Sequence, residues 1–117
     1  MNGCEWLVEA HGCEPGALTD LSRFQQLLDA LVQELPLHPL GQPLWHRFPG
    51  AGGITGLCLL AESHFACHSF PEHGSLCLNL FCCRPRPEWR FEEYLRAEFG
   101  AAEVRVRRFD RPYGVPR

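Results

Sequence analysis

The sequence predicts an α+β domain, a two-layer sandwich in which a mainly antiparallel sheet carries two helices on one face. Two segments show apolar residues at helical spacing. Strand-like runs outnumber these segments, and several of them follow one another directly in the middle of the chain. A chain of 117 residues is one domain of ordinary small size, with enough length for one core.

The first helix is expected over residues 20–35, and its apolar stripe lies at Leu21, Phe24, Leu28, Leu31 and Leu35. Thr19 or Asp20 can cap its start, and Pro36 ends it. The second helix is expected over 87–99, with Pro87 in its first turn and Gly100 as its C-terminal stop. Strands are expected at 5–12, 44–48, 54–61, 64–70, 75–83 and 102–109, with turns at 49–53 and 71–74 and an irregular tail over 111–117. The run 54–61 is almost wholly apolar, which predicts a strand that is buried on both faces or covered at an interface.

Composition excludes several classes of protein. The net charge of -3 and the scattered arginines give no sign of a nucleic-acid partner, and Arg105, Arg107 and Arg108 fit a solvated strand face. No apolar stretch approaches the roughly 20 residues that a membrane-spanning helix needs. The seven cysteines form no CxxC pair, and no secretory signal is seen. We therefore expect a cytoplasmic protein without a zinc ribbon or a thioredoxin-type site.

All eleven basic residues are arginine, so the chain contains no lysine. A pyridoxal-phosphate enzyme holds its cofactor on a lysine amine, and this chain cannot do so. If its chemistry needs an electrophilic carbonyl, the chain must obtain one in another way.

Polar residues of catalytic type are concentrated in residues 62–83, between otherwise apolar strands: Glu62, Ser63, His64, His68, Glu72 and Cys83. If the first part of this segment is extended, Glu62, His64 and His68 lie on one side and Ser63 on the other. Three chemistries are open at this point. The residues could hold zinc or iron through the histidines and glutamates, use Ser63 or Cys83 as a nucleophile, or support self-processing at Ser63.

The run from residue 55 to 83 resembles the bacterial and archaeal S-adenosylmethionine decarboxylase proenzymes. The matching features are Glu62-Ser63-His64, a second histidine at His68, Pro71-Glu72, and a strand ending in Phe81-Cys82-Cys83. The segment His46-Arg47-Phe48 also resembles the family, and the resemblance covers nearly the whole chain.

The resemblance implies that the chain cuts itself between Glu62 and Ser63 into a β chain, 1–62, and an α chain, 63–117. Ser63 would become a pyruvoyl group that forms a Schiff base with the substrate. By similarity to the family, His68 accepts a proton during processing, assisted by Thr55, and Cys83 donates a proton in catalysis. Glu72, Phe48 and Phe70 would bind the substrate. Cys82 is expected to point to the other face of its strand and to pack.

The implied activity is decarboxylation of S-adenosylmethionine for spermidine synthesis, by a homodimer with residues of both protomers at each active site. Phe70, His73, Asn79 and Arg84 depart from the family pattern near the expected substrate, and Thr55 replaces a serine. Arginine or ornithine therefore stay open as substrates on the same scaffold. A non-catalytic partner subunit and a His/Glu metal-binding domain are further alternatives.

Overall fold

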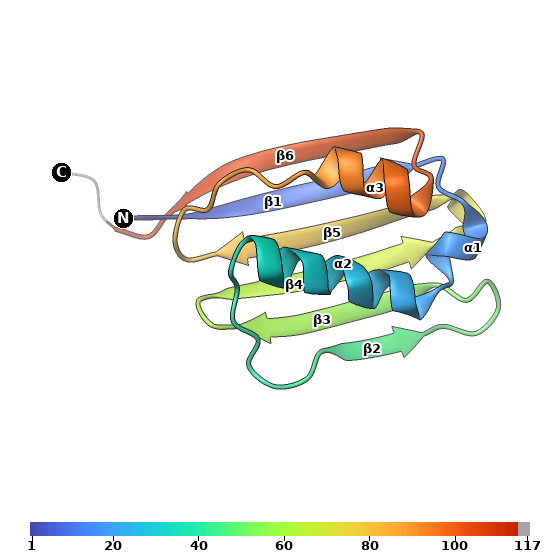
Figure 1. The fold of residues 1–117 in the computed structure, drawn as a ribbon, viewed down its shortest axis with the longest axis horizontal. Coiled ribbons are helices and arrows are strands. Elements are labelled where there is room, and N and C mark those ends of the chain that lie inside the picture. The colour runs from blue at the N-terminus through green and yellow to red at the C-terminus, as the bar shows by residue number, and fades with distance from the viewer. Residues whose placement is uncertain (115–117) are drawn as a thin grey trace.

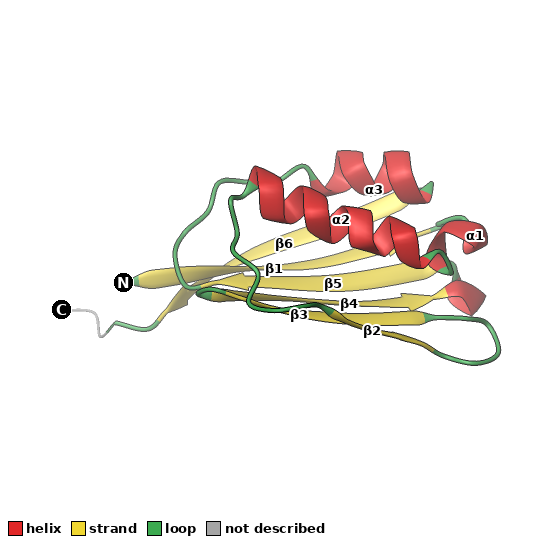
Figure 2. Cartoon of the chain, turned by 60° about the horizontal axis from the view of Figure 1, so that its bottom comes forward, coloured by secondary structure: helices red, strands yellow, loops and turns green. Residues whose placement is uncertain are grey.

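The computed structural model describes residues 1–114 and contains one six-stranded antiparallel sheet with its helices on one face (Figures 1 and 2). The strand order is β2-β3-β4-β5-β1-β6. The elements are β1 (Asn2–His11), α1 (Pro15–Leu18), α2 (Leu21–Glu34), β2 (Leu44–Arg47), β3 (Ile54–Leu60), β4 (Ser63–Phe70), the 3₁₀ turn η1 (Pro71–His73), β5 (Ser75–Cys82), α3 (Phe91–Phe99) and β6 (Glu103–Pro112). The predicted α+β sandwich is confirmed, and the short helix α1 is an addition to it.

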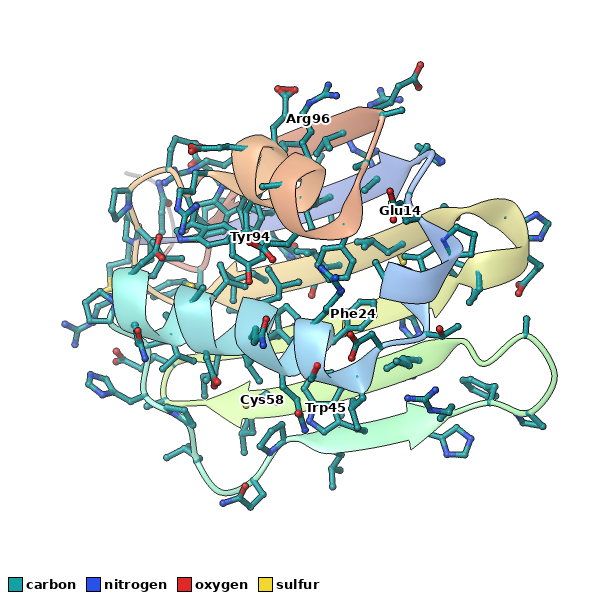
Figure 3. The ribbon with its side chains drawn as sticks, turned by 45° about the vertical axis from the view of Figure 1, so that its right-hand side comes forward. Glu14, Phe24, Trp45, Cys58, Tyr94 and Arg96 are labelled. Atoms are coloured by element: carbon teal, nitrogen blue, oxygen red, sulfur yellow. The ribbon has the colours of Figure 1, made fainter. Side chains whose placement is uncertain are left out.

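The core lies between the helices and the sheet. Asp20 caps α2 by accepting a hydrogen bond from the Ser22 backbone N–H at 3.0 Å, and the helix buries one apolar stripe. Phe24 of α2 and Tyr94 of α3 are both buried, and Figure 3 shows them between the two long helices. Phe24 packs against Phe99 of α3 at 5.0 Å between ring centroids. These aromatic contacts fix both long helices over the same sheet face.

The second helix begins later than predicted, at Phe91 instead of residue 87. Trp89 explains the difference, because its ring is buried and its indole N–H donates to the Glu34 carboxylate at 2.8 Å. The backbone next to this anchor is not helical, since Arg90 has φ -78° and ψ 54° at the start of the helix. Gly100 ends α3 in the left-handed conformation, as the sequence predicts.

The final strand is longer than expected and ends at Pro112. The first strand also begins earlier than expected, at Asn2, because β1 pairs with β6 along its whole length. The predicted irregular tail is therefore wrong for Arg111 and Pro112, and its residues 115–117 lie outside the described part of the chain.

Burial alternates along the three central strands, so the sheet has a covered face under the helices and an open face. Of the two interpretations of the apolar run 54–61, burial on both faces within the chain is wrong, because Leu57 and Leu59 are 51% and 61% exposed. Cover of this face at an interface stays a prediction. Along residues 1–114, no helix has the length and apolar character needed to span a bilayer.

Candidate active site

The β3–β4 hairpin places the Glu62–Ser63 peptide bond at a tight turn. Leu60 and Ser63 are paired, so only Ala61 and Glu62 form the loop. Glu62 has φ 61°, in the left-handed region that two-residue hairpin loops favour. A residue with a Cβ is strained there, by about 1 kcal/mol or more. The bond that the resemblance marks for cleavage therefore follows the only non-glycine residue with positive φ among the described residues.

The segment after β5 holds the carbonyl group of this bond. The Cys83 backbone N–H donates to the Glu62 carbonyl oxygen at 2.7 Å, and the Tyr113 hydroxyl donates to the Cys83 carbonyl at 3.1 Å. Ser63 is 7% exposed, and its Oγ donates to the Ala61 carbonyl at 3.3 Å. A fixed N–H on the carbonyl oxygen is the arrangement that stabilises a developing oxyanion.

The two adjacent cysteines lie in different environments. Cys82 is fully buried opposite Ser63, and its burial raises the pKa of its thiol to about 11. Cys83 is partly exposed at the end of the strand. The predicted packing role of Cys82 agrees with this placement.

Five of the predicted site residues line one cavity of about 520 Å³ at the other end of the same strands: Phe48, Thr55, His68, Phe70 and Glu72. The volume is in the range of small-molecule sites. Thr55 Oγ1 and His68 Nδ1 are 2.9 Å apart across β3 and β4, within hydrogen-bond distance. The His46 ring packs edge-on against Phe48 at 4.6 Å, which orients Phe48 at the cavity rim.

The structure does not bring all the predicted residues together in one chain. Ser63 lies on the covered face of β4, whereas His64 and His68 lie on the open face, as alternation predicts. Glu62 belongs to the turn, so its predicted place on the same side as the histidines does not hold. Ser63 and His68 are five positions apart along the strand, which is roughly 17 Å. One chain thus carries the predicted cleavage-site residues at one end of the hairpin and the cavity residues at the other.

Comparison with known proteins assigns the chain to a family. The sequence profile described as S-adenosylmethionine decarboxylase matches residues 4–112. The chain belongs to this decarboxylase family. It is 32% identical over 113 residues to an S-adenosylmethionine decarboxylase proenzyme of Prochlorococcus marinus, covering 95% of this chain and 88% of that protein. It is 28% identical over 106 residues to the proenzyme of Moorella thermoacetica, covering 90% and 83%.

A crystal structure of the adenosylmethionine decarboxylase of Aquifex aeolicus superposes on the present fold with a TM-score of 0.80. The sequences are 21% identical, and the superposition covers 98% of this chain and 94% of that one. Both residue groups described above lie inside the segment that matches the S-adenosylmethionine decarboxylase profile.

Two residues that contribute to the site are not predicted by the sequence patterns of this decarboxylase-family chain. Ser69 is buried beneath the cavity, where its Oγ donates to the Leu18 carbonyl at 2.7 Å and accepts from the Ile54 N–H at 2.9 Å. Arg84 pairs with the Glu62 carboxylate. Ser69 could be found from the sequence as a single serine at a covered-face position of an apolar strand. The sequence shows Arg84 only as a departure from the family pattern.

The metal-site alternative gains no support. In the part of the chain that the structure describes, no three histidine, cysteine, aspartate or glutamate side chains are grouped closely enough to hold a metal ion. His64 stacks on Phe81 at 5.5 Å between ring centroids, an ordinary packing contact on the open face.

Proposed function

We propose that this chain is a pyruvoyl-dependent S-adenosylmethionine decarboxylase that cleaves itself between Glu62 and Ser63. The observation that carries the proposal is the geometry of that bond. The bond follows Glu62, a residue with a strained backbone conformation, and the Glu62 carbonyl oxygen accepts a hydrogen bond from the Cys83 N–H at 2.7 Å. Ser63, on the other side of the bond, carries the hydroxyl that can attack it. Family membership adds the identity of the substrate.

Self-cleavage begins when Ser63 Oγ attacks the Glu62 carbonyl carbon. The negative charge then forms on the oxygen that Cys83 N–H contacts. Collapse of this intermediate breaks the peptide C–N bond, and the nitrogen takes the hydroxyl proton. The product is an ester with a free Ser63 amine. Relief of the strained turn favours this shift.

In the second step, His68 removes the Ser63 α-proton and the Glu62 carboxylate leaves, which gives dehydroalanine at residue 63. Tautomerisation and hydrolysis then release ammonia and leave a pyruvoyl group at the start of the α chain. Histidine suits this proton transfer because its pKa lies near neutrality in general. Thr55 holds the His68 ring through Nδ1 and leaves Nε2 free for the proton.

The residues present fit a pyruvoyl group made from the chain itself better than pyridoxal phosphate, because the chain has no lysine on which pyridoxal phosphate could be held. When present, the pyruvoyl carbonyl supplies an electrophile for the substrate's α-amine and accepts the electrons that decarboxylation releases. Cys83 lies beside residue 63 and would protonate the former α-carbon. Glu72 would accept hydrogen bonds from the ribose hydroxyls, and Phe48 and Phe70 would contact the adenine.

The separation of the two groups requires a second copy of the chain. The open face carries exposed apolar side chains at Leu44, Leu57 and Leu59, and no helix of residues 1–114 covers it (Figure 2). A two-fold pairing of open faces with opposite strand directions places the Ser63 end of one protomer at the cavity end of the other. Each active site then combines Ser63 and Cys83 of one copy with Thr55, His68 and Glu72 of its partner.

Intact-mass analysis of the purified protein tests self-cleavage. We expect two fragments, 1–62 and 63–117, with the second carrying pyruvoyl in place of serine, and one full-length mass for Ser63→Ala. Full-length protein in both cases would refute the proposal. Measured release of carbon dioxide separates the substrates, and we expect turnover with S-adenosylmethionine and none with arginine or ornithine.

The dimer has its own test. Leu57→Arg puts a charge in the middle of the open face without touching the core, because Leu57 is 51% exposed. We expect this variant to remain folded by circular dichroism, to become monomeric in analytical ultracentrifugation, and to lose self-cleavage. A dimeric variant that cleaves normally would rule out this face as the interface.

A further inference from the structure

Arg84 pairs with the side chain of the residue whose carbonyl is attacked. Its Nε lies 3.1 Å from Glu62 Oε2, and its Nη2 lies 3.4 Å from Glu62 Oε1, so two guanidinium nitrogens face two carboxylate oxygens. Both side chains are well exposed. Nothing in the chemistry described so far uses Arg84.

The residues around Arg84 are fixed, which limits where its guanidinium can lie. The preceding residue, Cys83, donates its N–H to the Glu62 carbonyl and accepts the Tyr113 hydroxyl on its own carbonyl. The Cys4 thiol points at the Arg84 carbonyl at 3.7 Å. Residues 83 and 84 therefore hold Glu62 at two points, its carbonyl oxygen and its carboxylate.

The charge of Glu62 matters because it belongs to the reacting residue. Attack by Ser63 turns the neutral Glu62 carbonyl into an oxyanion a few bonds from a carboxylate. Two negative charges at such a short separation repel each other. A positive charge beside the carboxylate removes most of that repulsion. The guanidinium of Arg84 is the cation within salt-bridge distance of Glu62 in residues 1–114.

We propose that Arg84 is a positioning residue for self-cleavage, which neutralises the Glu62 carboxylate and holds the left-handed turn while the oxyanion forms on the Glu62 carbonyl. This inference rests on the proposed cleavage at Glu62–Ser63. Exposed ion pairs are weak, so the expected effect is modest: Arg84→Gln slows cleavage by about two- to fivefold. High salt slows the unaltered chain toward the rate of the variant, because salt screens exposed charges.

The test is a double-mutant cycle on the first-order rate of cleavage, followed by denaturing gel and intact mass in freshly refolded precursor. The variants are Arg84→Gln, Glu62→Gln and both together, with Arg84→Lys as the conservative variant. We expect Arg84→Gln to be slow, Arg84→Lys to recover most of the rate, and Glu62→Gln to abolish the effect of removing Arg84. Dependence of the Arg84→Gln defect on the Glu62 carboxylate distinguishes charge neutralisation from general structural damage.

Arg96→Gln is the control for loss of an exposed arginine outside the cleavage turn. It removes the ion pair with Glu92 at 3.6 Å on the outer side of α3, and also the hydrogen bond that Arg96 donates to the Ala102 carbonyl at 2.6 Å (Figure 3). It should cleave at the unaltered rate. The inference is overturned if Arg84→Gln cleaves like the unaltered chain, or if its defect is equally large in the Glu62→Gln background. Absence of cleavage in the unaltered chain would instead overturn the proposed function itself.

Discussion

Mixing two variants provides a sharp test of the proposed shared active site. Ser63→Ala removes the proposed nucleophile and His68→Ala removes the proposed proton acceptor, and neither variant should complete cleavage alone. The structure places these residues on opposite faces of β4 and roughly 17 Å apart along it. A histidine side chain reaches only a fraction of that distance, so His68 cannot serve Ser63 of its own chain.

Co-refolding equal amounts of the two variants gives about half mixed dimers by random pairing. In each mixed dimer of the proposed geometry, the Ser63 end of the His68→Ala chain lies at the cavity end of the other chain, which carries an intact His68. About half of the His68→Ala chains should therefore be cleaved, and none of the Ser63→Ala chains. Intact mass distinguishes the two chains, and each variant refolded alone is the control. A mixture in which no chain is cleaved would show that His68 acts within its own chain and would refute the dimer geometry.

Further variants test the contact that holds His68, the packing beside β2 and the ion pair between α2 and the loop before α3. Thr55→Ala should slow cleavage by at least about tenfold because the His68 ring loses its partner, whereas Thr55→Ser should retain the rate; gel densitometry of the precursor measures both. Gly56→Ala should lower the free energy of unfolding by about 1–3 kcal/mol in urea titration, since the added Cβ would overlap the Trp45 ring; an unchanged midpoint would contradict that packing. Hydrogen bonds from the loop before α3, that of Arg90 foremost, lower the pKa of Glu34. Its contribution to stability is therefore present above the unfolded pKa of about 4.3 and lost as the pH falls through the lower folded value, so the melting-temperature gap to Glu34→Gln should close in acid.

The periodic parts of the fold could be predicted because local chemistry decides them. The apolar stripe and the Asp20 cap define α2, and Gly100 defines the end of α3. The start of α3 could not be predicted, since it depends on the bond from Trp89 to Glu34, which joins residues 55 positions apart. Pro87 is acceptable in a first helical turn, and only tertiary packing excludes it from the helix.

The division of the site could not be predicted from the sequence order. The segment 62–83 looks like one cluster because its residues are close in the chain, and the resemblance assigns them to one reaction. In the structure, the hairpin runs the length of the sheet, so residues 63 and 68 lie at different ends. Residues that are only a few positions apart on an extended strand already lie many ångströms apart. The register between strands is what brings Thr55 to His68 and Cys83 to Glu62.

The orientation of Ser63 gives the proposed cleavage a second consequence besides making a carbonyl. In the uncleaved chain, Ser63 faces the helices and is 7% exposed, whereas His68 and Phe70 of the cavity lie on the open face of β4 and Cys83 is partly exposed. A reacting group held there could not meet a substrate that enters from the open face. The proposed cleavage breaks the Glu62–Ser63 bond within the hairpin turn, and residue 63 becomes a chain end that is held by its strand pairing with Leu60 and Cys82. On this proposal the uncut chain keeps residue 63 away from substrate, and breaking that bond both generates the reactive group and gives it the freedom of a chain end.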